Sequence, residues 1–143
     1  MRGIFDLITK AVVMSEPGSL SIQPVDLKSP SKEDIVIDIN YSGISTGTEK
    51  LFYNGKMPQF PGMGYPLVPG YESTGEVVQA PKDSNLKIGD MVFVPGADCY
   101  SGSVKSLFGG AAQMIISSPN RLIKIDPTMG CNGALFALAA TAR

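Results

Sequence analysis

The alternation of apolar and polar residues along the chain predicts a series of short β-strands. It is clearest in residues 34–41 (DIVIDINY), where Ile35, Ile37 and Ile39 fall on one face. Shorter or less regular segments of the same kind span 9–14, 20–25, 72–79, 89–95, 109–117 and 121–125. Glycine, proline and polar residues separate them and indicate turns. This arrangement predicts a mainly β fold, a small barrel or sandwich.

Two segments depart from this pattern and predict helices. Residues 48–54 (TEKLFYN) predict one or two helical turns with a threonine cap. Residues 132–143 (NGALFALAATAR) are rich in alanine and leucine and predict a helix that is apolar nearly all round. This helix either folds back on the barrel or leads toward a second domain. We favour the second, because a barrel surface would otherwise have to cover Leu135, Phe136 and Leu138.

Composition narrows the class of protein. The 143 residues suit one domain, and a net charge of −1 argues against an electrostatic nucleic-acid surface. Charged residues interrupt the N-terminus, and no window approaches the roughly 18 apolar residues of a membrane span, so we expect a soluble, cytoplasmic protein. The chain has two cysteines and no histidine. The commonest metal ligand and the usual general base are therefore both missing.

The loop at residues 61–72 (PGMGYPLVPGYE) is the most informative segment. It interleaves turn residues with large apolar groups, and loops carry function more often than core packing. Together with the blocks at 41–50 (YSGISTGTEK), 89–95 (GDMVFVP) and 109–125, it resembles the N-terminal domain of medium-chain, alcohol-dehydrogenase-like reductases. The resemblance implies a GroES-like β-barrel. Within that superfamily the blocks are similar to a zinc-free branch that acts in bacteriochlorophyll biosynthesis.

This resemblance implies an NAD-dependent oxidation of a hydroxyethyl side chain on a tetrapyrrole to an acetyl group. It also implies a changed metal site. The cysteine position of zinc-containing relatives carries Ser45, the histidine position carries Tyr71, and residues 134–142 hold no cysteine. A catalytic zinc generally needs three ligands from Cys, His and carboxylates, so we expect a site without zinc.

Without a metal, the protein must orient the carbinol and accept one proton. Tyr71 is the first candidate for the proton contact, and a nearby Lys50 would lower its pKa. Thr46 and Thr48 are candidate hydroxyl relays, and Glu72 is a candidate anchor behind them. The alternatives stay open: Tyr71 as a buried loop aromatic, Lys50 as a solvated lysine, and the threonines as turn caps.

Apolar loop residues suit a flat macrocyclic substrate, because methionine and aromatic side chains adapt to apolar surfaces. The candidate substrate contacts are Ser45, Met57, Phe60, Met63, Tyr65 and Phe108, with Leu107 beside them. Covering the end of the barrel, meeting another domain or, for Ser45, capping a turn explains the same residues equally well.

The cofactor side is not visible in the sequence, because no G-x-G-x-x-G follows a strand. We expect an N-terminal extension at 1–8, a GroES-like substrate domain at 9–130, and at 131–143 the start of a helix toward an absent nucleotide-binding domain. Such a chain alone would be inactive. It leaves room for peripheral membrane contact and for a homo-oligomer formed through the missing domain. A zinc-free quinone or enone reductase and a non-catalytic GroES-like binding module are the alternative functions.

Overall fold

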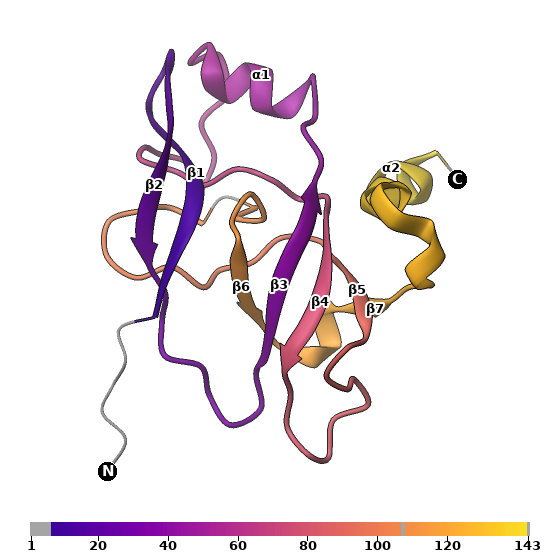
Figure 1. The fold of residues 1–143 in the computed structure, drawn as a ribbon. Coiled ribbons are helices and arrows are strands. Elements are labelled where there is room, and N and C mark those ends of the chain that lie inside the picture. Colours follow the sequence, from indigo (N-terminus) through magenta and orange to yellow (C-terminus); the bar gives the residue numbers. More distant parts are fainter. Residues whose placement is uncertain (1–6, 107, 143) are drawn as a thin grey trace.

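The computed structural model describes residues 7–106 and 108–142, which form a β ribbon, a β-sheet and short helices (Figure 1). The ribbon pairs β1 (Ile8–Glu16) with β2 (Ser19–Asp26). The antiparallel sheet has the order β6-β3-β4-β5-β7 and is built from β3 (Ile35–Ser42), β4 (Ser73–Gln79), β5 (Met91–Val94), β6 (Met114–Ser117) and β7 (Ile123–Lys124). The helices are α1 (Thr48–Tyr53), η1 (Pro119–Arg121), η2 (Pro127–Leu135) and α2 (Phe136–Thr141). None of them is long and apolar enough to cross a membrane.

One hydrophobic core joins the ribbon to the sheet. Val13 of the ribbon belongs to the same buried cluster as Ile35 and Ile37 of β3, both of which are fully buried. Val36, which alternation places on the opposite face, is also buried, at 5% exposure, and belongs to the same cluster. The first residues of β3 are therefore covered on both faces. The mainly β prediction is confirmed.

The strands do not close into a barrel within the described residues. β1 meets the segment before β6 through one bridge, between Ala11 and Ala112, rather than through a continuous ladder. The predicted strand at 109–117 begins only at Met114. Gly109 and Gly110 lie against other backbone segments: a Cβ on Gly110 would sit 2.6 Å from the Gly70 carbonyl oxygen. Because Gly109 and Gly110 make these contacts, they are not available to extend β6 toward its N-terminal end.

The C-terminal segment is less regular than the sequence predicts. The 3₁₀ helix η2 precedes the α-helix, which begins only at Phe136, and Gly130 breaks η2 with a φ of 52°. The Phe136 ring packs on the sheet, 5.7 Å from the ring of Phe93, whereas Leu135 and Leu138 are about half exposed. The division into an extension, a substrate domain and a connecting helix stays a prediction, and residues 1–6 and 143 lie outside the described part of the chain.

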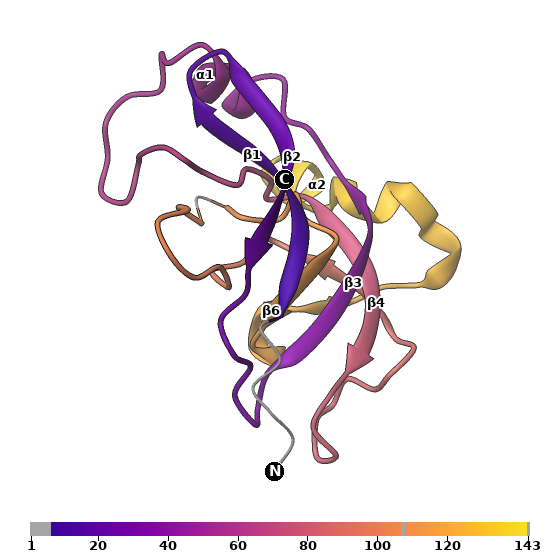
Figure 2. The same ribbon diagram turned by 60° about the vertical axis from the view of Figure 1, so that its left-hand side comes forward.

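The turn of the ribbon and helix α1 lie side by side (Figure 2). The amide of Gly18, in that turn, donates a hydrogen bond of 2.8 Å to the carbonyl of Tyr53 at the end of α1. At the base of the same region, the Gly43 amide donates to the Glu72 carbonyl over 2.6 Å, which ties the end of β3 to the start of β4. The loop between β3 and α1 is therefore held from both sides.

Gly75→Ala should destabilise the fold by about 2–3 kcal/mol, because a Cβ at this position would overlap the carbonyl oxygen of Asp38 on the adjacent strand. Gly47→Ala is the matched control, since the nearest atom to its new Cβ would be Ser45 Oγ at 3.9 Å. Its effect should stay within about 0.5 kcal/mol. Urea denaturation of both variants measures the difference, and equal midpoints would contradict this account of the packing.

Candidate functional site

A groove of 580 Å³ separates α1 and the loop before it from the β1–β2 ribbon. We call it the α1 groove; it is lined by Met14, Leu20, Ile44, Ser45, Thr46, Glu49, Lys50 and Tyr53. A smaller apolar cavity of 160 Å³ shares Met14, Leu20, Ile44 and Glu49 with it. The two spaces therefore adjoin along one wall. Three residues predicted as site residues, Ser45, Thr46 and Lys50, meet here.

Glu49 is the residue in this wall that the sequence analysis missed. Its side chain is only 6% exposed, and its Oε2 atom has no hydrogen-bond partner among the described residues. Burial raises the pKa of this carboxyl, the charge of Glu72 adds to the rise, and backbone amide groups partly offset it. The available signal was its place three residues before Phe52, which puts an acid on the buried face of a short helix.

Glu72 lies behind this wall, immediately before β4, and its role as an anchor stays a prediction. It is 3% exposed, and its Oε1 atom also lacks a partner among the described residues. Gly43 leaves room for the carboxylate, because a Cβ there would lie 2.7 Å from Glu72 Oε2. Gly43 has no positive φ, so its backbone conformation does not require glycine. The space taken by the Glu72 side chain does. Two acids, Glu49 and Glu72, are buried in the same region.

The loop before α1 is organised by its own hydroxyl group. Ser45 Oγ accepts a hydrogen bond of 3.2 Å from the amide of Thr48, so the turn-capping alternative holds for this serine. Thr46 is exposed on the wall of the groove, and Thr48 is partly buried as the first residue of α1. Lys50 is exposed at the groove, with no ion pair to an acid in the described chain.

Tyr71 lines neither of these two spaces, although its neighbour Gly70 lines the smaller one. Its ring packs edge-on against Phe108 with centroids 5.2 Å apart. Phe108 takes a positive φ of 71°, a rare conformation for a residue with a side chain, and also approaches Phe52 at 6.4 Å. No hydrogen bond joins Tyr71 to Lys50 in the described part of the chain. The pairing of these two residues stays a prediction.

Most of the predicted apolar substrate contacts form a small second core. Met57, Met63 and Tyr65 pack against a buried cluster of Met14, Phe52 and Leu67. The Tyr65 hydroxyl donates a hydrogen bond to the Phe52 carbonyl. These three residues therefore support α1, and their role as substrate contacts stays a prediction. Phe60 and Phe108 are each 39% exposed, and Leu107 lies outside the described residues.

The donors near the groove do not fit a catalytic zinc. The Ser45 hydroxyl already accepts a backbone bond, and the residue at the expected histidine position, Tyr71, packs against Phe108. That leaves the carboxylates of Glu49 and Glu72, fewer than the three protein ligands that such a site needs. Within residues 7–106 and 108–142, no cluster of three or more His, Cys, Asp and Glu could hold a metal.

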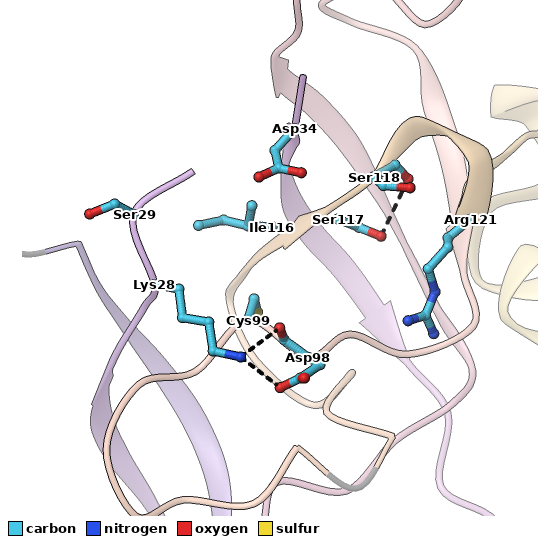
Figure 3. Close-up of a pocket in the computed structure, with 9 residues that line it drawn as sticks. All are labelled: Lys28, Ser29, Asp34, Asp98, Cys99, Ile116, Ser117, Ser118 and Arg121. Atoms are coloured by element: carbon cyan, nitrogen blue, oxygen red, sulfur yellow. Dashed lines mark hydrogen bonds and ion pairs between the residues drawn. The ribbon is translucent and has the colours of Figure 1, made fainter. Parts of the chain in front are cut away.

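A second cavity, of 280 Å³, lies at the opposite end of β3 (Figure 3). Lys28 pairs with Asp98 over 3.0 Å on one side, while Arg121 approaches from η1. Asp34 adds a second acid, so the two cations in the lining are balanced by two anions. None of the predicted site residues lines this cavity, and its charge selects neither an anion nor a cation. We therefore place the candidate site at the α1 groove.

Comparison with known proteins identifies the family. The profile of the alcohol dehydrogenase GroES-like domain matches residues 31–127. The chain belongs to this family. It is 56% identical over 135 residues to a 2-desacetyl-2-hydroxyethyl bacteriochlorophyllide A dehydrogenase of Rhodobacter capsulatus, covering 94% of this chain and 43% of the relative. A relative of the same name from Cereibacter sphaeroides is 53% identical over 139 residues and is covered to 44%.

The fold has its own parallels among solved structures. The 2R,3R-butanediol dehydrogenase of Bacillus subtilis superposes with a TM-score of 0.69 at 22% identity, over 89% of this chain and 43% of that protein. This likeness supports the GroES-like fold alone. The chain thus spans less than half the length of the curated relatives that it matches.

Glu49→Gln should stabilise the chain at neutral pH, and the gain should shrink as the pH falls. A raised pKa means that the folded state binds a proton more readily than the unfolded state between the ordinary glutamate pKa and the raised one. Stability of the parent chain therefore falls as pH rises through that window. Glutamine carries no charge to desolvate. Urea unfolding at several pH values measures the difference.

Glu33→Gln is the control for this comparison, because Glu33 is exposed before β3. Its effect on the free energy of unfolding should be small at every pH. A constant difference between Glu49→Gln and the parent chain from acidic to neutral pH would show that Glu49 is not held in a charge-disfavouring environment.

Proposed function

We propose that this chain is the substrate-side part of a dehydrogenase that oxidises the hydroxyethyl group of a bacteriochlorophyllide to an acetyl group. The main support for this proposal is the 56% identity to the Rhodobacter capsulatus dehydrogenase across 94% of this chain. We propose NAD as the hydride acceptor. Because the sequence has no G-x-G-x-x-G motif, the dinucleotide would be held by residues beyond this chain. The cytoplasm is the location that we propose for this reaction.

The chemistry suits a site without a metal. Loss of hydride from a carbinol carbon attached to a conjugated macrocycle is helped by delocalisation of the developing positive charge. The protein then has to orient the carbinol and receive its proton. Tyr71 is our proposed contact to the carbinol oxygen, with Thr46 and Lys50 assisting from the α1 groove and Thr48 from the first turn of α1. An apolar groove wall that includes Ile44, 81% exposed, suits the apolar face of the pigment.

Zinc should be dispensable. The donors at the groove are two carboxylates and hydroxyl groups, which do not make a tetrahedral nitrogen and sulfur site. Dialysis of the full gene product against a strong chelator should leave both the unfolding midpoint and pigment oxidation unchanged. Metal analysis after incubation with Zn²⁺ should find far less than one equivalent. One tightly held zinc per chain, with activity lost on its removal, would contradict the proposal.

The reaction can be followed directly, because conversion of hydroxyethyl to acetyl extends the conjugation of the macrocycle and shifts its absorbance to the red. The full gene product with NAD should turn over the hydroxyethyl pigment and show this shift. Reduction of quinones or enones with no change in the pigment would favour the quinone reductase alternative. Pigment binding without any turnover would favour the binding module.

Tyr71→Phe should lower kcat by about 100-fold, because it removes the hydroxyl that contacts the carbinol and keeps the ring packed on Phe108. Tyr41→Phe is the matched control, since Tyr41 is 48% exposed on β3 and should keep full turnover. Steady-state rates with the hydroxyethyl pigment measure both variants. Full turnover by Tyr71→Phe would remove Tyr71 from the mechanism.

A further inference from the structure

Two buried carboxylate oxygens have no hydrogen-bond partner among the described residues: Glu49 Oε2 and Glu72 Oε1. A buried charged group without a partner is costly, so a fold that keeps two such groups together calls for an explanation. The two acids differ in what they face. Glu49 lines both the α1 groove and the adjoining small cavity. No other acid among the described residues lines either space. Glu72 lines neither and sits behind Gly43.

We propose that Glu49 is the base that finally accepts the proton of the carbinol, and that Glu72, buried behind Gly43, is a positioning residue for it. This inference rests on the proposed dehydrogenase function and adds a residue and a role to it. Tyr71, the proposed carbinol contact, is a phenol, and a phenol is ordinarily protonated at neutral pH. It can pass a proton along but needs an acceptor beyond it.

The proton and electron balance of the step is simple. The C–H bond of the carbinol breaks and its electron pair leaves with the hydrogen as hydride to the nicotinamide, so the carbinol is oxidised and NAD is reduced. The O–H bond breaks, its electron pair forms the second bond of the new carbonyl, and the proton goes to the Glu49 carboxylate. The resulting carboxylic acid releases the proton to solvent through the α1 groove before the next turnover.

The surroundings of Glu49 suit this role. Besides Glu72, the titratable groups around it in the groove are Lys50 and Tyr53, neighbours on α1. Burial raises the pKa of Glu49 above its ordinary value, and the charge of the nearby Glu72 adds to the rise. The apolar lining of the small cavity, which includes Val12 and Pro69, excludes competing water from one side of the carboxylate. The exposed Lys50 balances the charge at the groove without pairing with it in the described structure.

The test compares Glu49→Gln and Glu49→Asp in the full gene product with NAD and the hydroxyethyl pigment. Glu49→Gln should lower kcat about 100-fold, leave the KM for pigment within about twofold, and abolish the acidic limb of the pH profile of kcat. Glu49→Asp should recover part of kcat and restore a shifted limb. Adding formate to Glu49→Ala should raise its rate in proportion to formate, since a small carboxylate can occupy the vacated space.

Glu76→Gln is the matched control, because Glu76 is an exposed acid on β4; its rates and pH profile should equal those of the parent. Circular dichroism on each variant separates misfolding from lost chemistry, and the formate response decides the case if Glu49→Gln folds poorly. If Glu49→Gln turned over as fast as the parent and kept the acidic limb of its pH profile of kcat, this inference would be overturned and the proposed function would stand. A parent that binds pigment but never oxidises it would overturn both.

Discussion

Two acids are buried without charge partners in the described structure where β3 and β4 separate, and the site is arranged around them. Glu72 stays there because Gly43 has no side chain and its amide is fixed to the Glu72 backbone. Glu49 stays there because it shares the inner face of α1 with Phe52, which is fully buried. Desolvating both carboxylates costs free energy, and the core beneath them must offset that cost. A function of the acid pair explains why the fold keeps it.

The ribbon and the sheet supply that core, and the small cluster of Met14, Phe52 and Leu67 extends it under α1. The loop that first suggested a substrate slot does much of this work, through Met57, Met63 and Tyr65. Its apolar side chains hold α1 in place beside the groove, and Met14 belongs both to this cluster and to the groove lining.

The strands with regular alternation and the helix α1 could be predicted from the sequence, because their local preferences agree with their burial. The segment at 109–117 could not, since Gly109 and Gly110 are committed to contacts with distant backbone. The contact of Phe136 with Phe93 could not be predicted either, because only tertiary structure brings the two rings near each other. Glu49 was overlooked because an acid in a short helix is ordinarily a surface residue, although its spacing from Phe52 places it on the buried face of α1.

The α1 groove presents the Glu49 carboxylate and hydroxyl groups, and Glu72 lies buried behind it. The most direct measurement is an NMR titration of the carboxyl carbons in glutamate-labelled chain, with Glu49→Gln used to assign the signal of Glu49. Our account predicts that this signal titrates above the ordinary glutamate range and moves down in Glu72→Gln. A Glu49 signal that titrates at or below the ordinary range would contradict it.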